Sequence, residues 1–260
     1  MTTSRDRVSF FGLEVQNVTL LEIEEELKEA LTGDRLVTIS TPNTEIAMNV
    51  RKDKDFRDLL NSFDIVIPDG IGLVIGSKIR GCPLKERVTG FDTSMKLLKL
   101  AKELDKKVYL LGGGEGVAER AGVEVEKDFG VQVVGTHSGY FQGAHIGAAN
   151  SEEDLKILKE IEDSGADILF VGMGSPKQES WINWYKDRLT AKVAIGNGGV
   201  IDILAKDLKR APEIFQKLGL EWFYRLVKEP SRIKRQIVLP LFLLEAIFNK
   251  NSIKAVKKNE

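Results

Sequence analysis

The feature that most constrains this 260-residue chain is a regular alternation of short apolar segments with longer helical ones. Stretches of ten or more residues whose apolar positions recur at helical spacing separate segments that read as strands. This alternation is typical of βαβ units. We therefore predict an α/β fold in which a mostly parallel, Rossmann-like sheet carries helices on both faces. The predicted strands include residues 36–40, 65–67, 108–111, 131–136, 167–171 and 193–195.

The alternation stops near residue 218. Residues 10–16, before it begins, are predicted to form one edge strand, and everything beyond residue 218 is predicted to be helical. From residue 221 onward the chain holds nine Lys and Arg against four Asp and Glu, although its total net charge is −1. We therefore divide the chain into an α/β core over 1–218 and a basic, apolar helical appendage over 219–260. The positive charge predicts an anionic partner for the appendage: a lipid head group, a phosphate or a nucleic acid.

Composition excludes several classes of protein. With 42% apolar and 30% charged residues, the chain is a soluble globular one. One cysteine and two histidines leave no material for an internal disulfide or a cysteine- or histidine-built metal site. No apolar run reaches the roughly 18 residues that a spanning helix needs, and the first residues lack a signal region. We expect a cytoplasmic protein that touches a membrane only from outside the bilayer core.

A single carboxylate, Asp69, follows the strand pattern of residues 65–67 and precedes Gly-Ile-Gly. In an open α/β sheet, ligands bind outside the carboxyl ends of the strands. Asp69 is placed either to act on a substrate as a catalytic base or to cap the following helix, since Asp is a preferred N-cap. The local sequence leaves both interpretations open.

Three more polar residues, Thr41, Asn43 and Arg87, fall on loops after early strands or helices. Together with Asp69 they offer a hydroxyl, an amide, a guanidinium and a carboxylate, a set suited to a polyhydroxylated, phosphate-bearing substrate. Residues 87–92 are predicted to be a loop in which Asp92 caps the next helix.

A glycine-rich loop at 112–116 lies between a predicted strand and a helix. Its backbone N–H groups either cradle a phosphate or simply form a tight turn. The loop does not match G-x-G-x-x-G, which disfavours a nicotinamide dinucleotide.

Two further loops carry polar residues after strands. Lys177 opens a helix whose dipole opposes its charge, and Gln178 lies beside it. This loop either binds a phosphate or sugar or simply carries polar residues on the surface. Asp202 follows the loop 196–199 and either accepts hydrogen bonds from a base or ribose or lies in the first turn of a helix. We include Gln178 and Asp202 among the candidate substrate-binding residues.

No Ser or Cys has a histidine partner at triad spacing, so the sequence contains no nucleophilic triad. His137 and His145 are interpreted as ordinary loop residues. The pair Tyr140-Phe141 is suited either to stacking on a base or to core packing.

The basic residues of the tail recur at steps of three to four across a proline break. The spacing allows one basic face on consecutive helices. Such helices either pack on the body with a solvated face or lie in a membrane interface with arginines on phosphates. The residues concerned are Arg225, Lys228, Arg232 and Arg235.

A set of motifs spread along the chain resembles the WecG/TagA/CpsF glycosyltransferase family, and within it the TagA-type N-acetylmannosaminyltransferases. The resemblance covers nearly the whole chain. The motifs are Thr41-Pro-Asn43, Pro68-Asp-Gly70, Glu86-Arg-Val-x-Gly-x-Asp92, the glycine loop after Tyr109-Leu-Leu, Gly135-Thr-His-x-Gly-Tyr-Phe141, Pro176-Lys-Gln-Glu179, Arg210-Ala-Pro212, Gly219-Leu-Glu-Trp222 and Tyr224-Arg225.

The resemblance implies transfer of N-acetylmannosamine from its UDP derivative to the 4-hydroxyl of GlcNAc on undecaprenyl diphosphate. The product would serve wall teichoic acid or a related surface polysaccharide. The resemblance also implies inversion at the anomeric carbon and no metal or cofactor. By motif, Asp69 would be the general base, Thr41, Asn43, Arg87 and Gln178 would line the site, and Arg225, Arg232 and Arg235 would reach the lipid diphosphate.

The partners expected on this interpretation are the UDP-sugar donor, the lipid-linked acceptor and the inner face of the cell membrane, with no nucleic acid. The sequence leaves a homo-oligomer open. Competing interpretations are a transferase with another hexose or uronic acid donor, a nucleotide-sugar epimerase or dehydrogenase, and a non-catalytic membrane adaptor.

Overall fold

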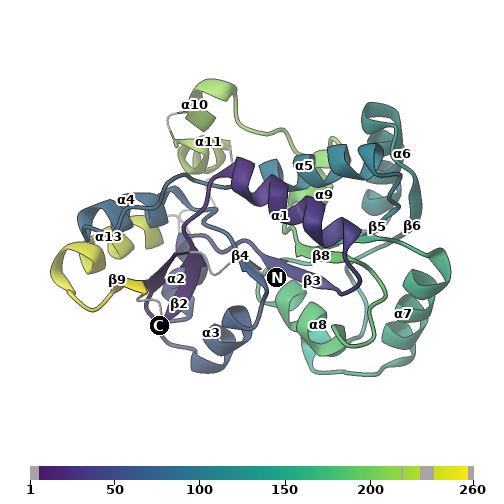
Figure 1. Ribbon diagram of the computed structural model, residues 1–260, viewed down its shortest axis with the longest axis horizontal. Helices are drawn as coiled ribbons and strands as arrows, with labels where there is room; N and C mark the ends of the chain where they lie inside the picture. Colours follow the sequence, from purple (N-terminus) through teal and green to yellow (C-terminus); the bar gives the residue numbers. More distant parts are fainter. Residues whose placement is uncertain (1–5, 218, 229–236, 257–260) are drawn as a thin grey trace.

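The structure is a computed structural model that describes residues 6–217, 219–228 and 237–256, apart from the side chains of residues 213, 217 and 225. Its centre is a six-stranded sheet in which every neighbouring pair of strands is parallel. The strand order is β4-β3-β8-β7-β5-β6 (Figure 1). This confirms the predicted parallel sheet. Its strands are β3 (Val37–Ser40), β4 (Ile65–Val66), β5 (Val108–Gly112), β6 (Val133–His137), β7 (Ile168–Gly172) and β8 (Val193–Gly196).

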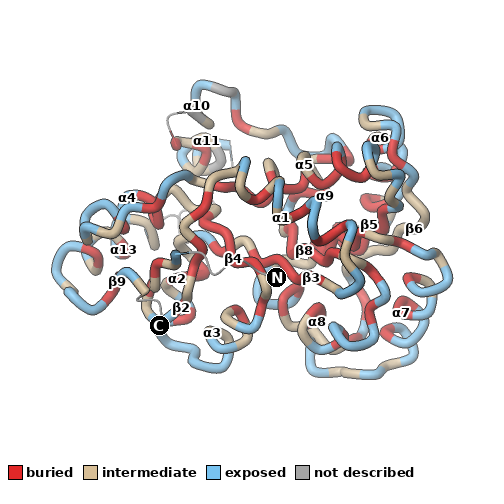
Figure 2. The backbone as a smooth tube through the Cα atoms, in the orientation of Figure 1, coloured by how far each residue is buried: buried red, intermediate tan, exposed pale blue. Residues whose placement is uncertain are grey.

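Helices cover both faces of this sheet, as the sequence predicted. Successive strand residues point to opposite faces, so Leu110 belongs to one apolar core and Leu111 to the other. Buried residues accordingly run along the central strands (Figure 2). One core is closed by α1 (Leu20–Thr32), α5 (Gly90–Glu103), α6 (Val117–Phe129) and α9 (Val200–Leu204); the other by α2 (Thr44–Asn49), α3 (Lys54–Asn61), α4 (Ile71–Ile79), α7 (Glu152–Ser164) and α8 (Lys177–Tyr185).

Most of these helices begin where their capping residues predict. Thr19 and Glu22 form a capping box at α1, and the side chain of Ser151 caps α7. The prediction that Asp92 caps α5 is wrong. Thr89 is the N-cap, its hydroxyl accepting from the Asp92 N–H at 3.0 Å, so Asp92 lies inside the first turn. Its carboxylate turns back to the N-cap, where it accepts a hydrogen bond from the Thr89 hydroxyl at 2.7 Å.

A second, antiparallel sheet joins the two ends of the described chain. It has the order β2-β1-β9 and contains β1 (Arg7–Phe10), β2 (Leu13–Gln16) and β9 (Ile253–Val256). The predicted single strand over 10–16 is wrong, because Phe11 and Gly12 take positive φ and turn the chain into a hairpin. The prediction of a wholly helical tail is also wrong for β9, which pairs with β1.

The described tail also contains two helices, α11 (Glu221–Lys228) and α13 (Val238–Phe248), and α10 (Glu213–Lys217) lies just before it. The buried ring of Phe242 on α13 stacks on Phe10 with centroids 6.2 Å apart. A Cβ built on Gly76 of α4 would lie 2.6 Å from that ring, so the two helices pack closely. The division of the chain at residue 218 stays a prediction, but α13 and β9 both pack on elements of the N-terminal third.

Among the described residues, no helix is both long enough and apolar enough to cross a bilayer. Two of the predicted lipid-diphosphate ligands, Arg232 and Arg235, lie outside the described residues, and Arg225 lies on α11 with its side chain not described.

Candidate functional site

The loops that carry the predicted site residues follow the carboxyl ends of neighbouring strands. Thr41 and Asn43 follow β3, Asp69 follows β4, Gln178 follows β7 and Asp202 follows β8. These four strands are adjacent in the sheet, in the order β4-β3-β8-β7. The sheet topology therefore brings the loops to one edge, where open α/β sheets bind ligands.

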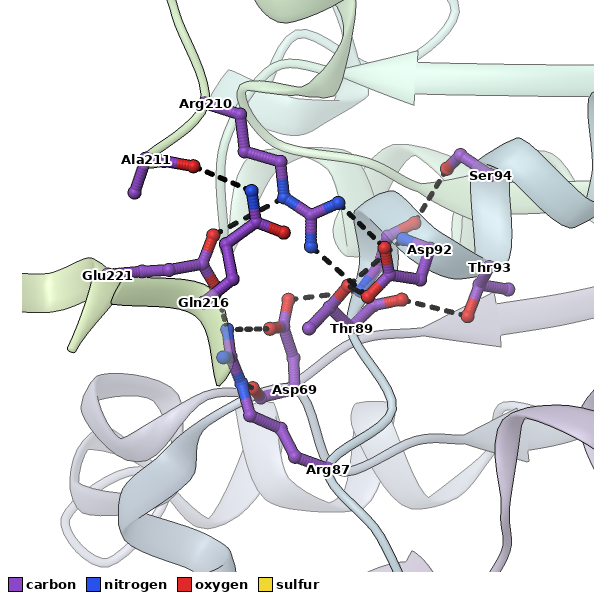
Figure 3. A network of polar contacts seen from close by, with 11 residues as sticks. Asp69, Arg87, Thr89, Asp92, Thr93, Ser94, Arg210, Ala211, Gln216 and Glu221 are labelled. Carbon is purple, nitrogen blue, oxygen red and sulfur yellow. Dashed lines mark hydrogen bonds and ion pairs between the residues drawn. The ribbon is translucent and has the colours of Figure 1, made fainter. Parts of the chain in front are cut away.

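Asp69 stands at the centre of a network of polar contacts (Figure 3). Its Oδ2 accepts a hydrogen bond from the N–H of Gly90 at 3.2 Å, and its own N–H donates to the carbonyl of Pro42 at 3.2 Å. The next helix, α4, has Gly70 as its N-cap and no side-chain capping bond. The interpretation of Asp69 as the cap of that helix is therefore wrong, which leaves its carboxylate facing the start of α5.

Arg87 lies directly beside Asp69. Its Nε donates to the Asp69 carbonyl at 2.8 Å, and its Nη2 is 3.9 Å from Asp69 Oδ1. The same Nη2 donates to Glu221 Oε2 at the start of α11. The guanidinium thus has a carboxylate on either side of its tip, and its charge lies next to the candidate base.

Arg210 extends the network on the other side of Glu221. It binds the Asp92 carboxylate through both Nη atoms, at 2.7 and 3.2 Å, and its Nε donates to Glu221 Oε1 at 3.4 Å. Its guanidinium carbon also lies 4.3 Å from the centroid of the Phe91 ring. Burial on its own would raise the pKa of Asp92, but the hydrogen bonds from Arg210 and Thr89 hold that pKa below its usual value.

Arg210 and Glu221 are not among the site residues predicted from the sequence, although they lie in the motifs Arg210-Ala-Pro212 and Gly219-Leu-Glu-Trp222. The charged residue within each motif is the sequence signal that could identify them.

Thr41 and Asn43 hold the neighbouring loop in shape. The Thr41 hydroxyl donates to the carbonyl of Gly196 at 3.2 Å and so ties the end of β3 to the end of β8. A Cβ built on Gly90 would lie 3.1 Å from the Thr41 Oγ1, so Thr41 lies close to the glycine that contacts Asp69. Asn43 caps α2, its Oδ1 accepting from the N–H of Ile46 at 3.0 Å.

Gln178 is buried, with 3% of its surface exposed, and its amide joins two loops. Its Oε1 accepts from the N–H groups of Gly174 at 3.1 Å and Gly198 at 2.9 Å, while its Nε2 donates to Glu179 Oε1 at 2.9 Å. These contacts hold the loop after β7 against the loop after β8. The described interactions do not link Gln178 to Asp69.

Asp202 lies in the first turn of α9, as one of the two interpretations of its sequence context predicted. Burial raises the pKa of its carboxyl above the ordinary value.

Two glycines of the loop after β5 have packing reasons to be glycine. A Cβ on Gly112 would lie 2.5 Å from the carbonyl oxygen of Gly172 on the neighbouring strand β7. Gly113 has a φ of +68°, and a Cβ there would lie 2.7 Å from Val117. These contacts explain the tight turn. Phosphate binding by the loop stays a prediction.

The two adjacent aromatic residues, Tyr140 and Phe141, lie in different surroundings. Phe141 is buried and makes edge contacts with the rings of His137 and His145, at centroid distances of 5.7 and 4.6 Å. Tyr140 is 82% exposed. Core packing is therefore the outcome for Phe141, and the ring of Tyr140 is open to a partner.

The loop after β6 is anchored by a buried carboxylate on α7. Asp154 accepts hydrogen bonds from the Trp181 indole at 2.8 Å and the Tyr185 hydroxyl at 2.7 Å, both on α8, and from the N–H of Ala144 at 2.9 Å.

The part of the chain that the structure describes contains no group of three or more His, Cys, Asp and Glu side chains arranged to hold a metal ion.

The parallel sheet with helices on both faces gives the chain a Rossmann-like α/β fold, and a carboxylate and arginines lie together at the edge where sheets of this class bind ligands. Within that class, the chain belongs to the glycosyl transferase WecG/TagA/CpsF family, whose model matches residues 8–255. This confirms the resemblance found in the sequence and makes the protein a glycosyltransferase.

Relatives from three species carry the same name, N-acetylglucosaminyldiphosphoundecaprenol N-acetyl-beta-D-mannosaminyltransferase. The protein of Bacillus subtilis strain 168 is 33% identical over 80% of this chain and 78% of its own length. That of Staphylococcus aureus strain MRSA252 is 32% identical over 96% of both chains. The protein of Bacillus spizizenii is 33% identical over 79% of this chain and 76% of its own.

Proposed function

We propose that this protein transfers N-acetylmannosamine from UDP-N-acetylmannosamine to the 4-hydroxyl of GlcNAc on undecaprenyl diphosphate. The product is a linkage unit for wall teichoic acid or a related surface polysaccharide. The names of relatives that match over most of both chains support this donor and acceptor. The structural observation that carries the proposal is Asp69, held by the Gly90 N–H and flanked by Arg87 at the carboxyl edge of the sheet.

In the proposed reaction Asp69 is the general base. The 4-hydroxyl oxygen of GlcNAc attacks the anomeric carbon of the donor while its proton passes to the Asp69 carboxylate. The bond from that carbon to the UDP oxygen breaks, and its electron pair leaves with UDP. A single displacement of this kind inverts the anomeric centre. A positioned base typically contributes about 10²–10⁴-fold to such a step.

Negative charge develops on the UDP leaving group, on the face of the sugar opposite the base, so cations that reach the UDP phosphates lower the barrier. Arg87 lies beside the base and lines the proposed site. Thr41, Asn43, Gln178 and Asp202 complete the donor side of the proposed site, and Arg225, Arg232 and Arg235 bind the diphosphate of the lipid acceptor.

A lipid-linked acceptor requires that the enzyme work at a membrane surface, and we propose the inner face of the cell membrane. Support comes from apolar side chains that remain exposed on two helices packed together, α4 and α13. On α13 they recur at steps of three to four and therefore share one face. We call this set the α4–α13 surface: Ile75, Ile79, Leu241, Leu244, Ile247 and Phe248.

The test is UDP release and product formation from UDP-N-acetylmannosamine with a GlcNAc-diphosphate-lipid acceptor, in the presence of chelator. We expect acceptor-dependent release by the wild type and a fall of about tenfold or more in kcat for Asp69→Asn, because the amide cannot take the proton. Asp58→Asn, which alters an exposed carboxylate on α3, is the matched control.

Other outcomes would separate the alternatives. Release only with a different UDP-sugar would replace the donor and keep the reaction class. A wild-type rate that Asp69→Asn reproduces would remove Asp69 as the base.

A further inference from the structure

Glu221, the first residue of α11, holds the two arginines of the site together. Its Oε2 accepts from Arg87 Nη2, and its Oε1 accepts from Arg210 Nε at 3.4 Å. Only 10% of its side-chain surface is exposed, so both contacts are made where solvent screens them weakly. One carboxylate from the tail thus fixes two guanidinium groups of the core at once.

The first arginine connects Glu221 to Asp69 directly. Arg87 keeps its Nε on the Asp69 carbonyl, while the tip of its guanidinium bonds to Glu221 and lies 3.9 Å from Asp69 Oδ1. The Arg87 tip is therefore held between two carboxylates. If the charge at Glu221 is removed, the Arg87 guanidinium is free to move from 3.9 Å into direct contact with the Asp69 carboxylate.

The second arginine reaches Asp69 by a longer route. Arg210 binds Asp92, and the Asp92 carboxylate accepts from the Thr89 hydroxyl at 2.7 Å. Thr89 caps α5, whose first residue, Gly90, donates its N–H to Asp69 Oδ2. Both routes start at Glu221 and end on Asp69, as Figure 3 shows.

We propose that Glu221 is a positioning residue for the transfer reaction, which couples the docking of α11 to the alignment of Asp69. The inference rests on the proposed function and adds to it a residue that does not itself touch the reacting atoms. Misalignment of a base acts on the transition state more than on donor binding, so kcat should fall while KM for the donor changes little.

The experiment compares Glu221→Gln and Glu221→Asp with the wild type and with Glu245→Gln. Glu245 is the matched control, because it also joins a tail helix to the core through an arginine, Arg51 at 2.6 Å, but lies outside the Asp69 network. A short-chain soluble acceptor removes membrane binding from the measurement, and thermal unfolding is recorded for every variant.

We expect kcat of Glu221→Gln to fall about tenfold or more, with KM for the donor within about threefold of the wild type. Glu221→Asp keeps the charge but draws the carboxylate back by one methylene, so its kcat should be intermediate. Glu245→Gln should keep the wild-type kcat even if its unfolding temperature drops.

A wild-type kcat for Glu221→Gln would overturn the inference. An equal loss of kcat in Glu221→Gln and Glu245→Gln would also overturn it. If Glu221→Gln does not fold, Glu221→Asp decides, since a wild-type kcat there would contradict a positioning role. A wild type that uses another UDP-sugar would refute the proposed donor alone, and the variants would be compared on that sugar. A wild type inactive with every UDP-sugar would overturn both proposals.

Discussion

At the scale of single residues, Glu179 is a carboxyl with 1% of its surface exposed and one oxygen without a hydrogen-bond partner among the described residues. Burial raises its pKa above the ordinary value of 4.5. An acid whose folded pKa exceeds its unfolded one binds its proton more tightly in the folded state. The free energy of unfolding therefore falls as pH rises from about 4.5 toward the folded pKa.

We predict that Glu179→Gln abolishes this part of the pH dependence. The amide has nearly the same shape and no charge to bury, so the variant should be more stable than the wild type at neutral pH and should match it more closely near pH 5. The wild-type slope that disappears is at most about 1.4 kcal/mol per pH unit.

The measurement is the unfolding temperature between pH 5 and 8, with Glu152→Gln, an exposed glutamate on α7, as control. Parallel curves for Glu179→Gln and the wild type would contradict the prediction.

Much of the site could be predicted at this scale. Asp69, Thr41 and Asn43 could be placed because each follows a strand whose apolar pattern is legible, and parallel strands end at one edge. The pairing of Glu221 with Arg87 could not, because no local pattern links two residues that are 134 positions apart in the chain. The same limit hid the role of Asp92, whose partner Arg210 lies 118 residues later.

At the scale of elements, the close contact between β5 and β7 depends on Gly112. A Cβ there would overlap the backbone of Gly172, which has no side chain that could move aside. We predict that Gly112→Ala forces the two strand ends apart and lowers the free energy of unfolding by roughly 1–3 kcal/mol, the usual cost of overpacking.

Gly114→Ala in the same loop is the control for stability. A Cβ on Gly114 would meet only Val117, at an ordinary 3.6 Å. Chemical denaturation of both variants measures the difference. Equal stability of the two would show that the strand ends accommodate the extra methyl group.

Helices were easier to predict than the small sheet. Thr19, Asp53 and Ser151 cap α1, α3 and α7, and each is followed by apolar residues at helical spacing. The sequence of the β1–β2 hairpin resembles a single strand, because its turn is short and begins with an apolar residue, Phe11. The sequence does not reveal β9, because four residues carry little periodicity and the partner strand β1 lies far away in the chain.

At the scale of the whole molecule, the α4–α13 surface is the part of the fold that we propose contacts the bilayer. We predict that the double variant Leu244→Ser/Phe248→Ser binds vesicles of phosphatidylethanolamine and phosphatidylglycerol at least about fivefold more weakly than the wild type. Loss of buried apolar area sets this decrease, since partitioning scales with that area.

Vesicle flotation measures the bound fraction. The control is Leu21→Ser, which removes a side chain that is 66% exposed on α1, on a different helix. If Leu21→Ser and the double variant weaken binding equally, or if neither does, the α4–α13 surface is not the membrane-facing side.

The pairing of β9 with β1 also sets the order in which the molecule can be completed during synthesis. The hairpin of β1 and β2 leaves the ribosome long before the strand that covers the edge of β1, because Phe10 pairs with Ile253. At about 5–20 residues per second, that edge waits for tens of seconds. The central parallel sheet has all its strands by Gly196, well before β9 exists. Closure of the small sheet, together with the seating of Phe242 against Phe10, is therefore a late event that seals an α/β body whose strands are already in place.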